Sequence, residues 1–139
     1  MIRSGSTITM EAWDMKYKPN SDWNHAWGAA PANIIPCYMW GIAPVEPGYA
    51  KALIKPQLGS LKYSKISVPT IRGNIEAEFI VKGNLKEYSI TIPANMECDF
   101  ILSNHEKSKA QINGEKIKTA TKLYKLKPGN NKIKFESLL

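Results

Sequence analysis

From about residue 48 onward, apolar and polar residues largely alternate, and this period of two constrains the fold more than any other feature of the chain. Apolar side chains occupy every second position of residues 75–81, 88–92 and 96–102. Such alternation is the pattern of strands that bury one face. The dipeptides Gly83-Asn84 and Asn113-Gly114 separate neighbouring runs and are typical of tight hairpin turns. With further runs at 52–55 and 61–68, the sequence predicts about eight short strands.

Short strands at regular spacing, separated by turn residues, favour a sandwich of two antiparallel sheets. We therefore predict a mainly β fold with an antiparallel β-sandwich over residues 42–139. No repeat or low-complexity tract interrupts this region.

The front of the chain has a different character, because residues 23–45 contain no Asp, Glu, Lys or Arg. Residues 20–22 form a helix-start cluster, and Gly41 is a plausible stop. Pro31 and Pro36 lie within this helix and should each kink or break it. The apolar residues recur at helical spacing, namely Trp23, Trp27, Ala30, Ile34 and Tyr38. Other apolar residues fall on the remaining faces, so the helix must be covered on most sides.

No other helix in the chain could supply that cover. We therefore interpret residues 1–41 as the last loop and helix of a larger helical domain. A membrane span is excluded, since Asn24, His25 and several prolines interrupt the apolar run.

Charge is distributed unevenly along the chain. The net charge is +7, and residues 1–41 are balanced, so the excess lies beyond residue 41. The lysines there, such as Lys116, Lys125 and Lys132, are spread along alternating strands, where lysine opposes edge-to-edge pairing. Few of them are interleaved with aromatic residues, so we expect no nucleic-acid partner.

The two cysteines, Cys37 and Cys98, are expected to be buried thiols rather than a disulfide or a metal site, and no cofactor is predicted. The first ten residues, MIRSGSTITM, lack the apolar core of a secretory leader. The compartment is left open, with a periplasmic or extracellular location conceivable for an exported parent enzyme.

Residues that could carry chemistry cluster near the beginning. Glu11 is flanked by bulky residues that can shift a carboxyl pKa, which suits an acid or a base. The pair Asn24-His25 stands between Trp23 and Trp27. Aromatic faces stack on sugar rings and polar groups bind hydroxyls, so these are the parts of a sugar site. The alternative is that Glu11 is a solvated loop residue and His25 a hydrogen-bonded core histidine.

These residues stand within strings that resemble the bacterial α-L-rhamnosidases of the glycoside hydrolase family 78 type. Residues 5–14, GSTITMEAWD, resemble the Gly-Ala-Thr-Thr-x-Trp-Glu-x-Trp-Asp segment near the end of that family's catalytic domain. Residues 20–29, NSDWNHAWGA, resemble its Asn-Ser-x-x-Asn-His-x-x-x-Gly helix, and residues 41–49, GIAPVEPGY, its connection to a C-terminal β-sandwich. Segments that resemble short sequence motifs of that sandwich domain follow at residues 54–56, 59–61, 70–73 and 88–95.

The resemblance covers nearly the whole chain in the family's order. It departs at Met10, where the family often has Trp, at the variable loop 15–19, and at Pro31 and Pro36 within the helix.

The resemblance implies an inverting glycosidase whose catalytic domain is an (α/α)₆ barrel, with two carboxyl groups on either side of the scissile bond. Glu11 would be the general base. His25 would bind the sugar, supported by Asn24, Trp23 and Trp27. The general acid of the family lies upstream, so we expect a C-terminal fragment that is inactive alone and whose partners are a rhamnose-containing glycan and the missing N-terminal catalytic portion. A carbohydrate-binding or structural sandwich module and a subunit that completes a split enzyme are the alternatives.

Overall fold

The computed structural model describes residues 5, 6, 8–102, 110–117 and 123–136. The chain divides into two compact units, the front unit Met1–Ile35 and the sandwich unit Pro36–Leu139. Each is described by itself below. The domain boundary that the sequence predicts, between residues 41 and 42, stays a prediction.

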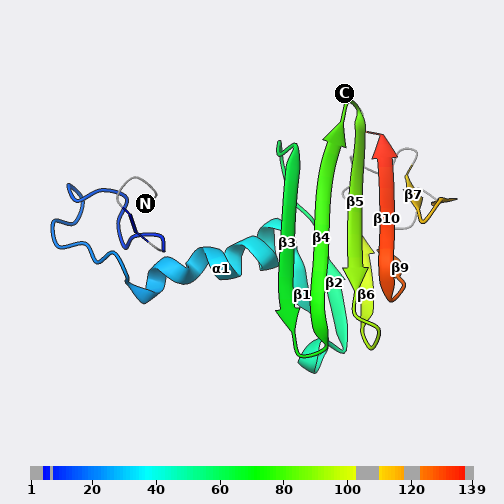
Figure 1. Cartoon of the computed structure of the whole chain (residues 1–139), viewed down its shortest axis with the longest axis horizontal. Coiled ribbons are helices and arrows are strands. Elements are labelled where there is room, and N and C mark those ends of the chain that lie inside the picture. Colours follow the sequence, from blue (N-terminus) through cyan, green and yellow to red (C-terminus); the bar gives the residue numbers. More distant parts are fainter. Residues whose placement is uncertain (1–4, 7, 103–109, 118–122, 137–139) are drawn as a thin grey trace. The chain divides into compact units, whose positions relative to one another are not determined.

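The sandwich unit contains two sheets, as the alternating pattern predicts (Figure 1). The smaller has the order β1-β2-β6-β9 and the larger the order β3-β4-β5-β10-β7-β8. The strands of the smaller sheet are β1 (Ile42–Pro44), β2 (Lys51–Ile54), β6 (Glu97–Ile101) and β9 (Leu123–Leu126). Those of the larger sheet are β3 (Tyr63–Thr70), β4 (Gly73–Lys82), β5 (Leu85–Ile92), β10 (Gly129–Glu136), β7 (Gln111–Ile112) and β8 (Glu115–Lys116).

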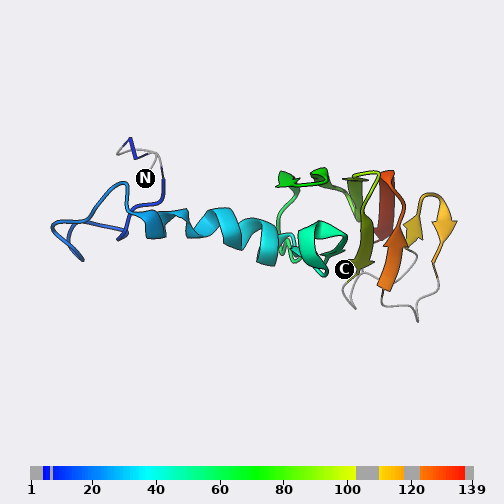
Figure 2. The same cartoon turned by 90° about the horizontal axis from the view of Figure 1, so that it is seen from below.

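The predicted hairpins are confirmed. Gly83-Asn84 joins β4 to β5, with Lys82 opposite Leu85, and Asn113-Gly114 joins β7 to β8. Asn113 and Gly114 both have positive φ, as the tightest hairpin turns require. The β7–β8 hairpin forms one end of the larger sheet, beside β10 (Figure 2). One pair departs from the antiparallel pattern, since β2 and β6 run parallel.

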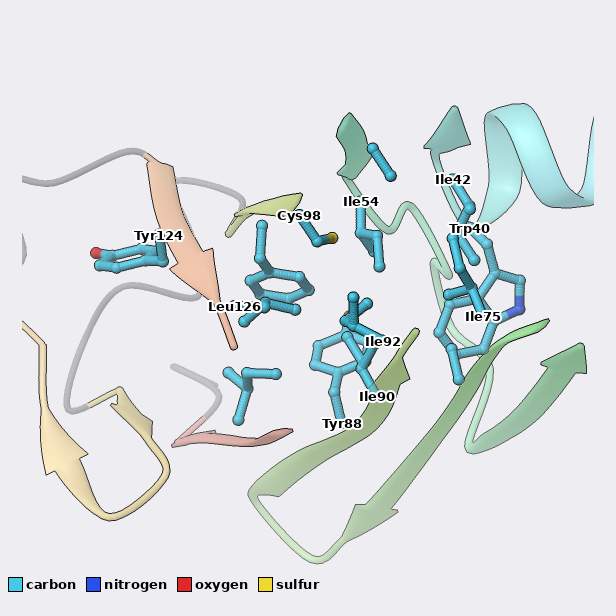
Figure 3. Close-up of a cluster of buried hydrophobic side chains, with 14 of the residues drawn as sticks. Trp40, Ile42, Ile54, Ile75, Tyr88, Ile90, Ile92, Cys98, Tyr124 and Leu126 are labelled. Atoms are coloured by element: carbon cyan, nitrogen blue, oxygen red, sulfur yellow. The ribbon is translucent and has the colours of Figure 1, made fainter. Parts of the chain in front are cut away.

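The core lies between the two sheets and follows the predicted alternation. Every second residue of β4 and β5 points inward, and Ile75, Tyr88 and Ile90 are almost wholly buried. Figure 3 shows Tyr88 among the inward side chains of both sheets. Its ring centroid lies 4.8 Å from that of Phe79 and 5.6 Å from that of Phe100. Aromatic contacts of this kind dominate the burial energy of such a core.

The chain enters β1, the first strand of the sandwich unit, through Trp40 and Gly41. Trp40 is fully buried, and its indole N–H donates to Ser64 Oγ at 3.1 Å. Gly41 has φ +63°, and a Cβ atom there would lie 2.1 Å from the carbonyl oxygen of Lys55. Glycine is therefore required at this entry point, for both its backbone conformation and the space it leaves.

The predicted front helix is a helical run over residues 26–39, made of three short elements. They are a 3₁₀ turn η2 (Ala26–Ala29), an α turn α1 (Ala30–Ile34) and a π turn η3 (Ile35–Met39); a further 3₁₀ turn, η4 (Pro47–Tyr49), precedes β2. The predicted helix start at residues 20–22 was wrong, because His25 stands at the N-cap and Asp22 Oδ1 instead accepts the Asn24 N–H at 3.0 Å. Pro31 lies in the first turn of α1, where its missing donor is tolerated.

Both cysteines are free thiols. Cys98 is buried, and desolvation raises its pKa to about 12. Cys37 is only partly buried, contrary to the prediction. In the part of the chain that the structure describes, no helix has the length and apolar character needed to cross a membrane.

Candidate functional site

The candidate residues lie in the front unit, where two segments run close together. The Glu11 backbone N–H donates to the Asp22 carbonyl at 3.3 Å, and the Thr9 hydroxyl donates to the Gly28 carbonyl. Gly28 is buried, and a Cβ atom there would lie 1.9 Å from the Thr9 carbonyl oxygen. The absence of a side chain at Gly28 thus lets the Glu11 segment approach the start of the helical run.

The Glu11 carboxylate is held by two donors. Its side chain is 12% exposed and forms an ion pair with the Lys18 ammonium, while Asp22 N–H donates to Oε2 at 3.3 Å. The Lys18 hydrogen bond, followed by the Asp22 backbone hydrogen bond, lowers the pKa of Glu11 below its ordinary value. Glu11 is therefore ionised at neutral pH.

His25 is brought to the same place. Its Nδ1 atom lies 3.8 Å from Glu11 Oε1 and 3.9 Å from Asp22 Oδ2, both longer than a hydrogen bond. The Trp27 ring meets the imidazole edge-on, with ring centroids 5.1 Å apart and planes at 83°. Trp27 thus orients an imidazole that is one-third exposed and keeps hydrogen-bonding capacity for a ligand.

The other predicted site residues are more exposed than Glu11 and His25. Trp27 contacts His25 but is 79% exposed, and Trp23 is 45% exposed. Asn24 is exposed, and its backbone N–H is taken by Asp22 Oδ1. The structure therefore brings Glu11, His25 and Trp27 together and leaves Trp23 and Asn24 at the surface. Thr7, within the Glu11 motif, lies outside the described residues.

Two residues of the cluster were missed by the sequence reasoning. Lys18 belongs to the loop 15–19, which looked merely variable, and Asp22 looked like a helix cap. In the sequence, only their charge could have pointed to them, since Lys18 and Asp22 are among the few ionisable residues between Glu11 and the uncharged stretch. Their pairing with Glu11 depends on how the loop folds back.

This arrangement places an ionised carboxylate next to an imidazole and an exposed indole face. The carboxylate can take a proton from water, as a general base does. The imidazole and the indole can hold a hydroxylated ligand beside it. Among the described residues, no three His, Cys, Asp or Glu side chains are grouped so that they could hold a metal ion.

Comparison with protein families places the chain beside known sugar-cleaving enzymes. The family model described as the bacterial alpha-L-rhamnosidase C-terminal domain matches residues 41–118. An alpha-L-rhamnosidase from Alteromonas sp. (strain LOR) is 29% identical over an alignment of 123 residues, and the match covers 82% of this chain and 13% of that protein. The chain therefore spans about an eighth of the length of this relative.

Solved structures share the fold at low identity. An α-L-rhamnosidase from Dictyoglumus thermophilum matches with a TM-score of 0.80 and 21% identity, over 99% of this chain and 17% of that chain. The Streptomyces avermitilis enzyme, solved with L-rhamnose, matches with a TM-score of 0.76 and 17% identity, over 97% and 14% of the respective chains. Both matches cover nearly the whole of this chain.

Proposed function

The chain belongs to the family of bacterial α-L-rhamnosidase C-terminal domains, and from this premise we propose that it forms the C-terminal part of an α-L-rhamnosidase-type glycoside hydrolase whose general base is Glu11. The observation that carries the proposal is the placement of the Glu11 carboxylate beside an imidazole and an exposed indole. His25 Nδ1 lies 3.8 Å from Glu11 Oε1, and the Trp27 ring stands edge-on to that imidazole.

An inverting glycosidase needs two carboxyl groups with different tasks. One carboxylate removes a proton from a water molecule that attacks the anomeric carbon, and a carboxylic acid on the opposite face protonates the departing oxygen. Glu11 is suited to the first task because it is ionised. His25 and the exposed Trp27 face would hold the rhamnose ring beside it.

We propose that the acid comes from the remainder of the enzyme, of which this chain corresponds to about an eighth by length. The chain alone should then be inactive, since general acid catalysis is typically worth roughly 10²–10⁴-fold and most of the substrate pocket would be elsewhere. The exposed apolar residues of the helical run, such as Ile34 and Tyr38, would pack against that remainder.

The first test is hydrolysis of 4-nitrophenyl α-L-rhamnopyranoside by the chain alone, where we expect no release of nitrophenol above the uncatalysed rate. Turnover lost in both Glu11→Gln and Asp22→Asn would contradict the proposal, because Asp22 would then supply the second carboxyl group within this chain.

The second test places the chain in a complete enzyme. The corresponding segment of the Alteromonas α-L-rhamnosidase is replaced by this chain, and Glu11→Gln is compared with Asp14→Asn. Asp14 is a matched control, because its carboxylate accepts the Lys16 N–H at 2.9 Å in an exposed loop. Glu11→Gln should lower kcat by roughly 10²–10⁴-fold with little change in KM, whereas equal kcat in both variants would exclude Glu11 as the base.

A further inference from the structure

A depression of about 570 Å³ lies where strand β10 meets the β7–β8 hairpin, far along the chain from Glu11. Its lining is made of amide and ammonium side chains and one glycine: Gln111, Asn113, Gly114, Asn130, Lys132 and Lys134. No carboxylate of a described residue belongs to this lining. Amide groups bind sugar hydroxyls, and ammonium groups bind carboxylate or sulfate oxygens.

The charges of the larger sheet explain why this end is basic. On the outward face, β4 and β5 contribute Glu76, Glu78 and Glu87, and Lys65 of β3 lies opposite Glu78. Lys134 lies opposite Glu87, with Nζ 3.7 Å from the carboxylate, and is partly neutralised. Lys132 lies opposite Ser89, and its side chain makes no ion pair or hydrogen bond with any described residue.

A second depression of about 300 Å³ shares Asn113 with the first and adds to the positive field. Three more lysines line it, Lys116, Lys125 and Lys127, with Glu115 as its acidic residue. The two depressions together therefore attract anions, and part of the chain's excess positive charge is gathered around this hairpin.

The wall of the first depression is rigid. Asn131 is fully buried, accepts hydrogen bonds from Asn113 Nδ2 and Lys127 N–H at 3.1 Å each, and donates to the Lys127 and Gly129 carbonyls at 2.7 and 3.1 Å. Asn113 Oδ1 in turn accepts the Lys132 N–H at 2.8 Å. This network holds Asn113 and its turn against β10, so this wall of the depression is formed before any ligand binds.

We propose that this depression is a binding subsite for an acidic sugar residue, one that carries a carboxylate or a sulfate ester, within the glycan that the enzyme cleaves. Lys132 would bind the anionic group, while the side-chain amide of Gln111 and the side-chain Oδ1 of Asn130 would bind neighbouring hydroxyls. The inference rests on the proposed function for its choice of a glycan, but its site, ligand contacts and test are independent of Glu11.

The test is calorimetric titration of the full chain at low salt with a short oligogalacturonate and with its carboxyl-reduced neutral counterpart. We expect the acidic oligosaccharide to bind and the neutral one to bind at least about tenfold more weakly. Lys132→Gln should lower the affinity by about tenfold, whereas Lys65→Gln, on β3 of the same sheet face, should leave it unchanged. Thermal unfolding of each variant checks that the fold is retained.

Several outcomes would overturn the subsite. These are equal binding of the neutral oligosaccharide, equal losses in Lys132→Gln and Lys65→Gln, competition by inorganic sulfate beyond that of sodium chloride at the same ionic strength, or equal binding of a short oligothymidylate. The last two would indicate a free-anion site or general attraction to polyanions. Glu11→Gln is titrated alongside and should bind normally, so a failure of the general-base proposal would leave this result intact.

Discussion

The two units of this chain use similar apolar residues to opposite effect. In the sandwich unit, aromatic residues such as Trp40, Phe79 and Tyr88 are buried between two sheets that cover each other. In the described part of the front unit, Gly28 is the only residue that is buried, and Trp13 and Trp27 are 95% and 79% exposed. Hydrophobic side chains thus stabilise a fold only where the same chain supplies their partners.

The front unit is held instead by hydrogen bonds and ion pairs around Glu11. Exposed interactions of this kind contribute little free energy each. We infer that the sandwich unit supplies the stability of the chain and the front unit its chemistry. The following predictions test that division, from the largest effect on unfolding to the smallest.

Removing the aromatic centre of the core should have the largest effect. Tyr88→Ala should lower the free energy of unfolding by about 3–5 kcal/mol, because a large cavity opens among Phe79, Phe100 and Phe135. Denaturant unfolding followed by circular dichroism measures it. Tyr63→Ala is the control, since Tyr63 is 54% exposed on β3, and should change stability by less than about 1 kcal/mol. Equal losses would mean that the core does not dominate stability.

A methyl group at the entry to the sandwich should be the next most costly change. Gly41→Ala combines positive φ with a clash against the Lys55 backbone and should destabilise by about 2–3 kcal/mol. Gly83 has nearly the same φ as Gly41 but open space around it, so Gly83→Ala should lower the free energy of unfolding by about 1 kcal/mol. Gly28→Ala clashes as severely, yet should leave the sandwich unfolding transition in place because it lies in the front unit. A lowered transition in Gly28→Ala would show that the two units unfold together.

A smaller effect is expected on the titration of Glu11. Lys18→Met should raise the Glu11 pKa toward its ordinary value, since the Lys18 hydrogen bond that lowers it most is lost, whereas Lys16→Met should not. Because the folded-state pKa is depressed, ionised Glu11 stabilises the front unit above the unfolded pKa, and that contribution is lost as pH falls through the folded-state pKa. Carboxyl carbon chemical shifts measured against pH report the Glu11 pKa in the unsubstituted chain and in each variant. An unchanged Glu11 pKa in Lys18→Met would show that Lys18 does not bind the Glu11 carboxylate.

The smallest effect on unfolding should follow from the largest change, deletion of residues 1–35. Residues 36–139 should unfold cooperatively at nearly the same denaturant concentration as the full chain, because the buried apolar core begins at Trp40. Light scattering should also show less self-association, since several exposed aromatic residues are removed. Aggregation of the shortened chain beside a monomeric full chain would show that the front unit completes the sandwich core.

Local patterns in the sequence were enough to predict most of the strands and two of their turns, but not β1 (Ile42–Pro44). Alternation along β4 and β5 identified the residues that face the core, and the Gly83-Asn84 and Asn113-Gly114 turns fixed two hairpins. The parallel pairing of β2 with β6 was not predictable, because it joins strands over forty residues apart and leaves no local signature. Likewise, the residue types around Glu11 and His25 suggested a sugar site, but not that Lys18 would form an ion pair with the carboxylate.

The sequence by itself determined the class of fold, the family and the candidate base, because these depend on periodicity, turn residues and short motifs that are written locally. Tertiary structure decided which charges meet. Lys18 lies against Glu11 because its loop folds back, and Lys132 stays unpaired among the described residues because β5 places Ser89 rather than an acid opposite it. Electrostatic interactions depend on distance in space and on burial, and neither quantity is set by position along the chain.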